Sequence, residues 1–240
     1  MALLAGAGPM GLGAIDYAIH CERRPSLLVV TDVDEKRLER AARIYTTEKA
    51  AQRGVTLAYC NAPDTAKLME LSGGSGYDDV FVYAPVAPLV EQGDAILGYD
   101  GCLNFFAGPT DPTFAAKMNF YNVHYNATHL AANSGGNTAD MIESLEMMAA
   151  GKIDPSVMIT HIGGMDAAID TTLNLPNIPG GKKLIYNHIS MPLTAIADFA
   201  DLGKHDPLFA RLAELTGQND GIWSPACEAY LLENAKLIGE

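Results

Sequence analysis

Short apolar runs alternate with amphipathic segments from the start of the chain to about position 136. The apolar runs have the length of buried strands, and the segments between them carry apolar side chains at helical spacing. Strands that alternate with helices indicate a parallel sheet with right-handed crossovers. We therefore predict an α/β fold with a doubly wound parallel sheet of six strands. The predicted strands lie at 1–5, 26–31, 55–60, 79–83, 101–107 and in the region 119–132, and the predicted helices lie at 12–19, 34–53, 64–71 and 89–97.

The pattern changes from about position 137, where the apolar runs become shorter and helical patterns predominate. Three prolines, Pro192, Pro207 and Pro225, stand at expected helix starts, because proline is well tolerated in the first turn of a helix. The predicted elements of this part are helices at 138–150 and 165–173, strands at 157–161 and 183–186, and a mostly helical stretch at 190–240. The sequence thus predicts one domain at 1–136 and a mostly helical C-terminal appendage at 137–240.

The first apolar run leads directly into Gly6-Ala-Gly-Pro-Met-Gly, a G-x-G-x-x-G pattern between a predicted strand and a predicted helix. In this pattern Gly6 allows a tight turn, Gly8 lets a pyrophosphate approach the backbone, and Gly11 lets the helix pack closely on the strand. The helix N-terminus offers free N–H groups and partial positive charge to the phosphates. This combination predicts a Rossmann dinucleotide-binding domain. The alternative is that the glycines only form a tight strand–helix turn.

An acidic residue, Asp32, ends the second predicted strand, close to the spacing of about 20 residues that the dinucleotide-binding pattern requires. A carboxylate at this place accepts hydrogen bonds from the adenosine ribose hydroxyls and repels a 2′-phosphate, so it favours NAD over NADP. Arg37 leaves NADP open, because an arginine near that ribose can bind a 2′-phosphate. The alternative for Arg37 is an ordinary solvated helix residue.

Charge and composition narrow the function classes. The 240 residues include 16 Lys and Arg and 29 Asp and Glu, which gives a formal net charge of −13. Such a chain repels phosphates, so we expect no nucleic-acid partner and no anionic membrane partner. The start of the chain shows no signal-peptide pattern, and we expect a cytoplasmic protein. The four cysteines form no C-x-x-C pair, and we expect them to be buried thiols rather than metal ligands or disulfides.

Several segments resemble the medium-chain, zinc-type alcohol and polyol dehydrogenases. The resemblance is carried by Ala5-Gly-Ala-Gly-Pro-Met-Gly-Leu, Thr31-Asp-Val-Asp-Glu-Lys-Arg-Leu, Gly76-Tyr-Asp-Asp-Val-Phe-Val and Gly151-Lys-Ile-Asp-Pro with Ile159-Thr-His. It covers roughly positions 1–187. The tail, from Met191-Pro-Leu-Thr to Trp223-Ser-Pro-Ala-Cys-Glu-Ala-Tyr-Leu-Leu, is similar to the C-terminal extension of the branch called L-sorbose-1-phosphate reductase.

The resemblance implies an oxidoreductase that interconverts an alcohol and a ketone of a polyol or sugar phosphate with NAD or NADP. In that family a zinc ion in an N-terminal domain binds the substrate oxygen and stabilises the alkoxide. We expect this domain to be absent from the chain, so neither a zinc ligand nor a catalytic residue is carried over. The implied cofactor contacts are Gly6, Gly8, Pro9, Met10 and Gly11 at the pyrophosphate, Asp32 and Arg37 at the adenosine ribose, Ala84, Pro85, Val86, Ala107 and Gly108 near the nicotinamide, and more weakly Ser134 and Gly135.

Three functions remain open at this point. The chain is the cofactor-binding part of a zinc-type dehydrogenase, or it is a non-catalytic dinucleotide-binding or sensing module. The third alternative is an enzyme that uses the same fold without a metal, with Tyr83 or His124 as the acid–base residue. For Ala84–Val86 an ordinary strand–helix turn is an equal alternative to a binding role. We also expect a homodimer through the sheet edge at 119–132, because an exposed edge strand invites pairing with its twin.

Overall fold

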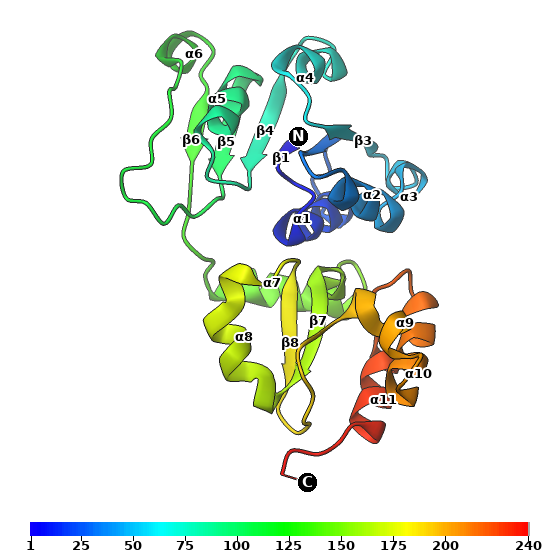
Figure 1. Ribbon diagram of the computed structural model, residues 1–240. Coiled ribbons are helices and arrows are strands. Elements are labelled where there is room, and N and C mark those ends of the chain that lie inside the picture. The colour runs from blue at the N-terminus through cyan, green and yellow to red at the C-terminus, as the bar shows by residue number, and fades with distance from the viewer. Residues whose placement is uncertain (240) are drawn as a thin grey trace. The chain divides into compact units, whose positions relative to one another are not determined.

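The computed structural model describes residues 1–239. These residues form two compact units, Met1–Ile153 and a second unit that begins at Asp154 (Figure 1). Among residues 1–239, no helix is both long enough and apolar enough to cross a membrane.

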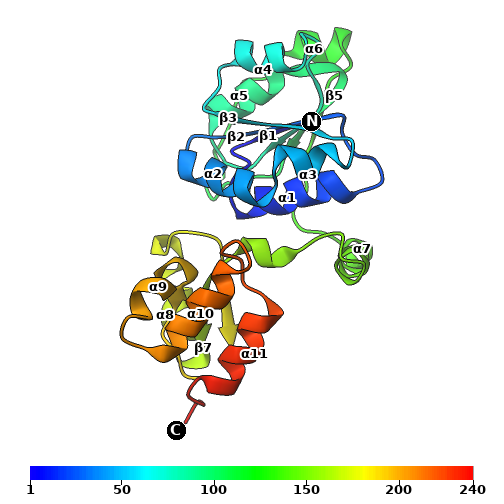
Figure 2. The ribbon, with the colours of Figure 1, turned by 90° about the vertical axis from the view of Figure 1, so that its right-hand side faces the viewer.

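The first unit is built on a parallel sheet of six strands in the order β3-β2-β1-β4-β5-β6. This is the strand order of a Rossmann fold, and it confirms the predicted doubly wound sheet. The helices α1, α2 and α3 lie on one face of the sheet, and α4 and α5 lie on the other (Figure 2). The strands are β1 (Ala2–Leu4), β2 (Leu27–Asp32), β3 (Thr56–Asn61), β4 (Tyr77–Val82), β5 (Leu97–Phe105) and β6 (His129–Ala131). The helices are α1 (Pro9–His20), α2 (Glu35–Ile44), α3 (Thr47–Ala51), α4 (Thr65–Leu71), α5 (Ala87–Ala95), α6 (Phe120–Tyr125) and α7 (Thr138–Ala149).

The central strands are buried on both faces by apolar side chains. All three residues of β1 are fully buried, and Val80 and Val82 of β4 and Leu103 of β5 are equally inaccessible. Gly93 of α5 packs directly over these three side chains, since a Cβ at this position would lie 2.8 Å from Leu103 Cδ1. This close packing brings the sheet and its helices into one core and holds the strand ends in fixed positions.

Two predicted elements of this unit are wrong in detail. The single helix predicted at 34–53 ends at Ile44, and α3 starts after a break where Thr46 Oγ1 accepts a hydrogen bond from Lys49 N at 3.2 Å. The strand predicted from position 119 is partly helix α6, and only β6 pairs with β5. Asn119 Oδ1 accepts a hydrogen bond from Tyr121 N at 3.1 Å, so this residue caps a helix rather than continuing a strand.

The second unit contains a three-stranded sheet in the order β8-β7-β9. Its apolar core joins Phe199, Leu212, Trp223 and Leu231 of the tail to Ile162 of β7, so the tail folds onto this sheet. Pro207 and Pro225 start helices as predicted, but Pro192 precedes the short strand β9 instead. The elements are β7 (Ile159–Gly164), α8 (Ala168–Asn174), β8 (Lys182–Tyr186), β9 (Thr194–Ala195), α9 (Phe199–Leu202), α10 (Pro207–Gly217) and α11 (Pro225–Asn234), with 3-10 turns at Pro155–Met158, Met165–Ala167, Leu175–Asn177 and Ile196–Asp198.

Helix α7 belongs to the first compact unit, although the predicted boundary at 136/137 precedes it. Tyr17 of α1 donates a hydrogen bond to Glu143 Oε1 of α7 at 3.2 Å, and Met147 is the buried residue of α7. The compact unit therefore extends to Ile153, past the boundary that the pattern of the chain predicts. The assignment of dinucleotide binding to residues 1–136, and of an appendage to residues 137–240, stays a prediction.

Candidate functional site

The glycine-rich loop between β1 and α1 contains glycines of two kinds. A Cβ on Gly6 would lie 2.5 Å from Leu3 Cβ, and a Cβ on Gly11 would lie 1.9 Å from the carbonyl oxygen of Gly6. The fold itself therefore requires these two glycines. A Cβ on Gly8 would meet no atom within 4 Å, and its φ of −74° suits any residue. Gly8 leaves open space above the loop, as expected where a phosphate approaches the backbone.

The glycine-rich loop places the N-terminus of α1 at the carboxyl end of β1. Ala5 has a φ of +52°, in the left-handed region, and Gly6 N donates a hydrogen bond to Thr31 O of β2 at 2.7 Å. Gly8 is the N-cap of the 12-residue helix α1 without a side-chain cap, and Pro9 follows in the first turn. The first turn contains no acidic side chain, and Met10 is 42% exposed. The helix N-terminus is thus free to interact with an anion.

Asp32 lies at the end of β2 and is only 4% exposed. Its Oδ2 accepts a hydrogen bond from Ala7 N of the glycine-rich loop at 3.3 Å, and its Oδ1 accepts one from Asp34 N at 3.0 Å. The carboxylate therefore connects the loop to the start of α2. Each carboxylate oxygen can accept more than one hydrogen bond, so these contacts leave acceptor capacity for a ligand.

Arg37 lies in the first turn of α2, close in sequence to Asp32. Asp34 caps this helix, accepting hydrogen bonds from Lys36 N at 3.0 Å and Arg37 N at 3.3 Å. Arg37 Nε lies 3.4 Å from Asp34 Oδ2, and both side chains are about half exposed. An exposed pair of this kind is weak, so the guanidinium can turn towards another anion.

The remaining predicted contacts gather at the same edge of the sheet, at the carboxyl ends of β4, β5 and β6. Tyr83 N donates a hydrogen bond to Leu4 O at 3.0 Å, which places the turn Ala84-Pro85-Val86 beside the end of β1. Ala107 N donates to Val82 O at 3.0 Å, which places Ala107 beside β4. Val86 and Gly108 are exposed, whereas Ala107 is buried. Ser134 and Gly135 follow β6, the outermost strand, in an exposed loop.

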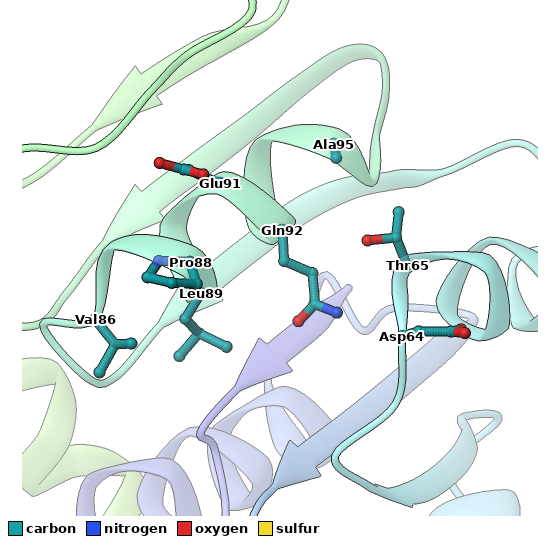
Figure 3. Close-up of a pocket in the computed structure, with 8 residues that line it drawn as sticks. All are labelled: Asp64, Thr65, Val86, Pro88, Leu89, Glu91, Gln92 and Ala95. Atoms are coloured by element: carbon teal, nitrogen blue, oxygen red, sulfur yellow. The ribbon is translucent and has the colours of Figure 1, made fainter.

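The sequence pattern missed a shallow groove between the N-terminus of α4 and helix α5 (Figure 3). Its volume is about 540 Å³. Across it, Gln92 Nε2 donates a hydrogen bond to Pro63 O at 2.9 Å. The groove begins where β3 and β4 end, next to the predicted contact Val86. Only the strand order could have shown this, because it brings two segments that are distant in the sequence to one edge. The lining residues include Asp64, Thr65, Val86, Leu89 and Gln92.

The two proposed acid–base residues of the metal-free alternative differ in position. Tyr83 follows β4 at the carboxyl edge, but burial raises the pKa of its phenol far above the usual value, which disfavours the phenolate. His124 lies on α6, whose end contacts the amino-terminal half of β5, since Asp100 N donates a hydrogen bond to Asn126 O at 2.8 Å. His124 therefore lies away from the predicted cofactor contacts.

Within residues 1–239, no three or more His, Cys, Asp or Glu side chains are grouped so that they could hold a metal ion. The described residues thus do not form the zinc site that the resemblance implies for the family. The four cysteines are free thiols, but only Cys227 is buried, so the expectation that all four are buried is wrong.

Comparison of the sequence with curated proteins gives three strong relatives. The chain is 55% identical to the uncharacterized protein YggP of Escherichia coli, matching all of this chain and 58% of that protein. It is 54% identical to a mannitol-1-phosphate 5-dehydrogenase of Aliivibrio fischeri (97% and 56%) and 44% identical to an L-sorbose 1-phosphate reductase of Klebsiella pneumoniae (98% and 55%). The chain thus spans little more than half the length of these relatives. No family model matches it.

Solved structures share the fold at low sequence identity. The benzyl alcohol dehydrogenase of Acinetobacter calcoaceticus aligns with a TM-score of 0.59 at 20% identity, over 77% of this chain and 48% of that one. The 2R,3R-butanediol dehydrogenase of Bacillus subtilis aligns with a TM-score of 0.60 at 15% identity, over 78% and 50%. With the sequence relatives, these matches confirm the resemblance found in the motifs. The chain therefore resembles polyol-phosphate and sugar-phosphate oxidoreductases in sequence, over a little more than half of their length, and alcohol dehydrogenases in fold.

Proposed function

We propose that this chain is the nicotinamide dinucleotide-binding part of an oxidoreductase that interconverts an alcohol and a ketone of a polyol or sugar phosphate. The names of the relatives support the substrate class, because both named enzymes act on phosphorylated compounds of this kind. We propose a substrate like that of an L-sorbose 1-phosphate reductase. The observation that carries the binding role is the glycine-rich loop, in which Gly8 alone of the three glycines has open space above it.

Different residues of the chain would contact different parts of the dinucleotide. The loop amides and the N-terminus of α1 would hold the pyrophosphate, and Asp32 and Arg37 would lie at the adenosine ribose. The groove between α4 and α5 would receive the adenine, because it opens at the ends of β3 and β4. The turn after β4, with Ala107 and Gly108, would border the nicotinamide, which supplies hydride chemistry when bound. NAD is the proposed cofactor, and Arg37 leaves NADP open.

A titration of the full chain with NADH tests the binding role. Gly8→Val should fold normally, since nothing lies within 4 Å of its Cβ, but should weaken NADH binding by about tenfold or more. Gly217→Val, which also adds a side chain into open space, in the second unit, is the matched control and should bind like the unmutated chain. No binding by the unmutated chain, or equal binding by Gly8→Val, would overturn the proposal.

A non-catalytic dinucleotide-binding module is the second candidate. The coding sequence upstream of Met1 separates the two candidates. An in-frame segment that encodes a further domain with a Cys, His and Glu set would support the dehydrogenase, whereas a stop codon directly upstream would support the binding module.

We further propose a cytoplasmic homodimer. All four cysteines are free thiols in the structure, which fits a reducing compartment. The three residues of β6 are all exposed at the outer edge of the sheet. Pairing of two β6 strands would extend the sheet across both copies and cover this edge.

A further inference from the structure

Strand β5 ends at Phe105, beside the carboxyl end of β4. The backbone N–H groups of Phe106 and Ala107 both donate to Val82 O, at 3.2 and 3.0 Å. Phe106 N also lies 3.1 Å from Asn104 O, to which it donates, so the chain turns directly after Phe105, the last residue of β5. This turn places Phe106 outside the regular strand, beside the end of β4.

The two phenylalanines at this strand end pack against different partners. The Phe105 ring stacks on Phe114, with ring centroids 5.6 Å apart, and belongs to the core. The Phe106 ring packs against Tyr83, with centroids 5.1 Å apart and the planes tilted by 47°. Unlike Phe105, Phe106 is 45% exposed. A large apolar ring thus stays open to solvent between the predicted contacts Ala84–Val86 and Ala107.

Sheet alternation shows which face carries this ring. Gly93 of α5 packs over Val80 and Val82, so the alternate residues Phe81 and Tyr83 point to the other face. This is the face on which α1 lies (Figure 2). Because Phe106 packs on Tyr83, its ring lies on the same side as the helix that the glycine-rich loop starts. Phe106 thus lies at the carboxyl ends of β4 and β5, on the face of the sheet where the glycine-rich loop leads into α1.

We propose that Phe106 is a cofactor-contacting residue whose ring forms a platform for the nicotinamide of the bound dinucleotide. This inference rests on the proposed function. The Tyr83 ring packs against this platform and supports it. The face of an aromatic ring attracts flat cations, and the oxidised nicotinamide ring is positively charged whereas the reduced ring is neutral. Phe106 therefore binds the oxidised cofactor in preference to the reduced one and shifts the balance between the two bound forms.

Binding measurements on the full chain test this role with three ligands: NAD⁺, NADH and ADP-ribose, which lacks the nicotinamide. Phe106→Leu should weaken NAD⁺ binding by about three- to tenfold. It should weaken NADH binding less and leave ADP-ribose binding unchanged. Phe106→Tyr keeps the ring face and should restore the unmutated pattern. Phe105→Leu is the matched control, because it removes the neighbouring ring from the core and should leave the ratio of NAD⁺ to ADP-ribose affinity unchanged.

Two outcomes overturn the inference alone. One is an equal loss of affinity for NAD⁺ and ADP-ribose in Phe106→Leu, and the other is unchanged NAD⁺ affinity in that variant. Failure of the proposed function looks different, because the unmutated chain would then bind none of the three ligands. That result would overturn both proposals together.

Discussion

At the scale of single residues, the structure separates side chains that serve the fold from those that remain free to serve a ligand. Gly6 and Gly11 are required by close backbone contacts, whereas Gly8 is not. The same distinction applies to Phe105, which is part of the core, and Phe106, which is exposed beside it. Identical residue types at neighbouring positions thus have different roles, because their surroundings differ in space rather than in sequence.

Asp32 should set the preference between NADH and NADPH. Asp32→Asn removes the negative charge and keeps one of the two oxygens, so the side chain can still accept a hydrogen bond from Ala7 N or from Asp34 N, but not from both in the present geometry. We expect the ratio of NADH to NADPH affinity to fall by about tenfold, since the amide no longer repels a 2′-phosphate and accepts weaker hydrogen bonds from the ribose. Parallel titrations with the two reduced dinucleotides measure this ratio.

The control for this experiment is Asp34→Asn, the same chemical change at the next acidic position, where the carboxylate caps α2 and pairs with Arg37. It should alter the ratio less than Asp32→Asn. Equal affinity for NADH and NADPH in the unmutated chain, unchanged by Asp32→Asn, would refute the role assigned to Asp32.

At the scale of elements, the hydrophobic pattern predicted most strands and helices correctly. It failed where a helix cap or a neighbouring strand determines which element forms. The apolar runs at 26–31 and 55–60 became β2 and β3 with small shifts. The segment 120–125 also looks like a strand, but the Asn119 cap and the hydrogen bond from Asn119 N to Asp94 Oδ2 at 2.8 Å start a helix there. That carboxylate comes from α5, well outside the segment, and local periodicity contains no information about it.

Strand β7 contains a histidine that should make stability depend on pH. Burial, and then the charge of Lys183, lower the pKa of His161 below its ordinary value, although Asp198 opposes the shift. The unfolded chain therefore binds a proton more readily than the folded chain, so stability should decrease as the pH falls through the ordinary histidine range near about 6.5. His161→Gln should show a smaller difference between its unfolding temperatures at neutral pH and at mildly acidic pH.

Thermal unfolding followed by circular dichroism measures this difference. The exposed His205→Gln is the control, and it should retain the pH dependence of the unmutated chain. If His161→Gln loses as much stability on acidification as the unmutated chain, His161 is not the group responsible.

At the scale of the whole molecule, the exposed outer strand β6 is the proposed interface between two copies of the chain. Leu130, in the middle of β6, is 59% exposed. Leu130→Lys places a charge on this edge and should shift the dimer towards monomer by about tenfold or more in dissociation constant. Light scattering coupled to size-exclusion chromatography over a range of concentrations measures the shift.

The matched control is Leu173→Lys, the same change at an exposed leucine of α8 in the second unit. It should leave the dimer intact. A monomeric mass for the unmutated chain at micromolar concentration would contradict the proposed homodimer, and an equal effect of both variants would contradict the proposed interface.

The sequence by itself determined the strand, the glycine-rich loop, the helix and the acidic strand end, because these features follow one another within the segment 1–32 and depend on local sterics. It also determined the number of strands in the first unit and their alternation with helices, whereas β9 of the second unit lies in a stretch predicted to be mostly helical. Only the tertiary structure decided which strand ends become neighbours. The order β3-β2-β1-β4-β5-β6 places Val86 and Ala107 beside a loop from the start of the chain. The groove at Gln92 and the exposed ring of Phe106 exist only through such distant contacts, which no local pattern records.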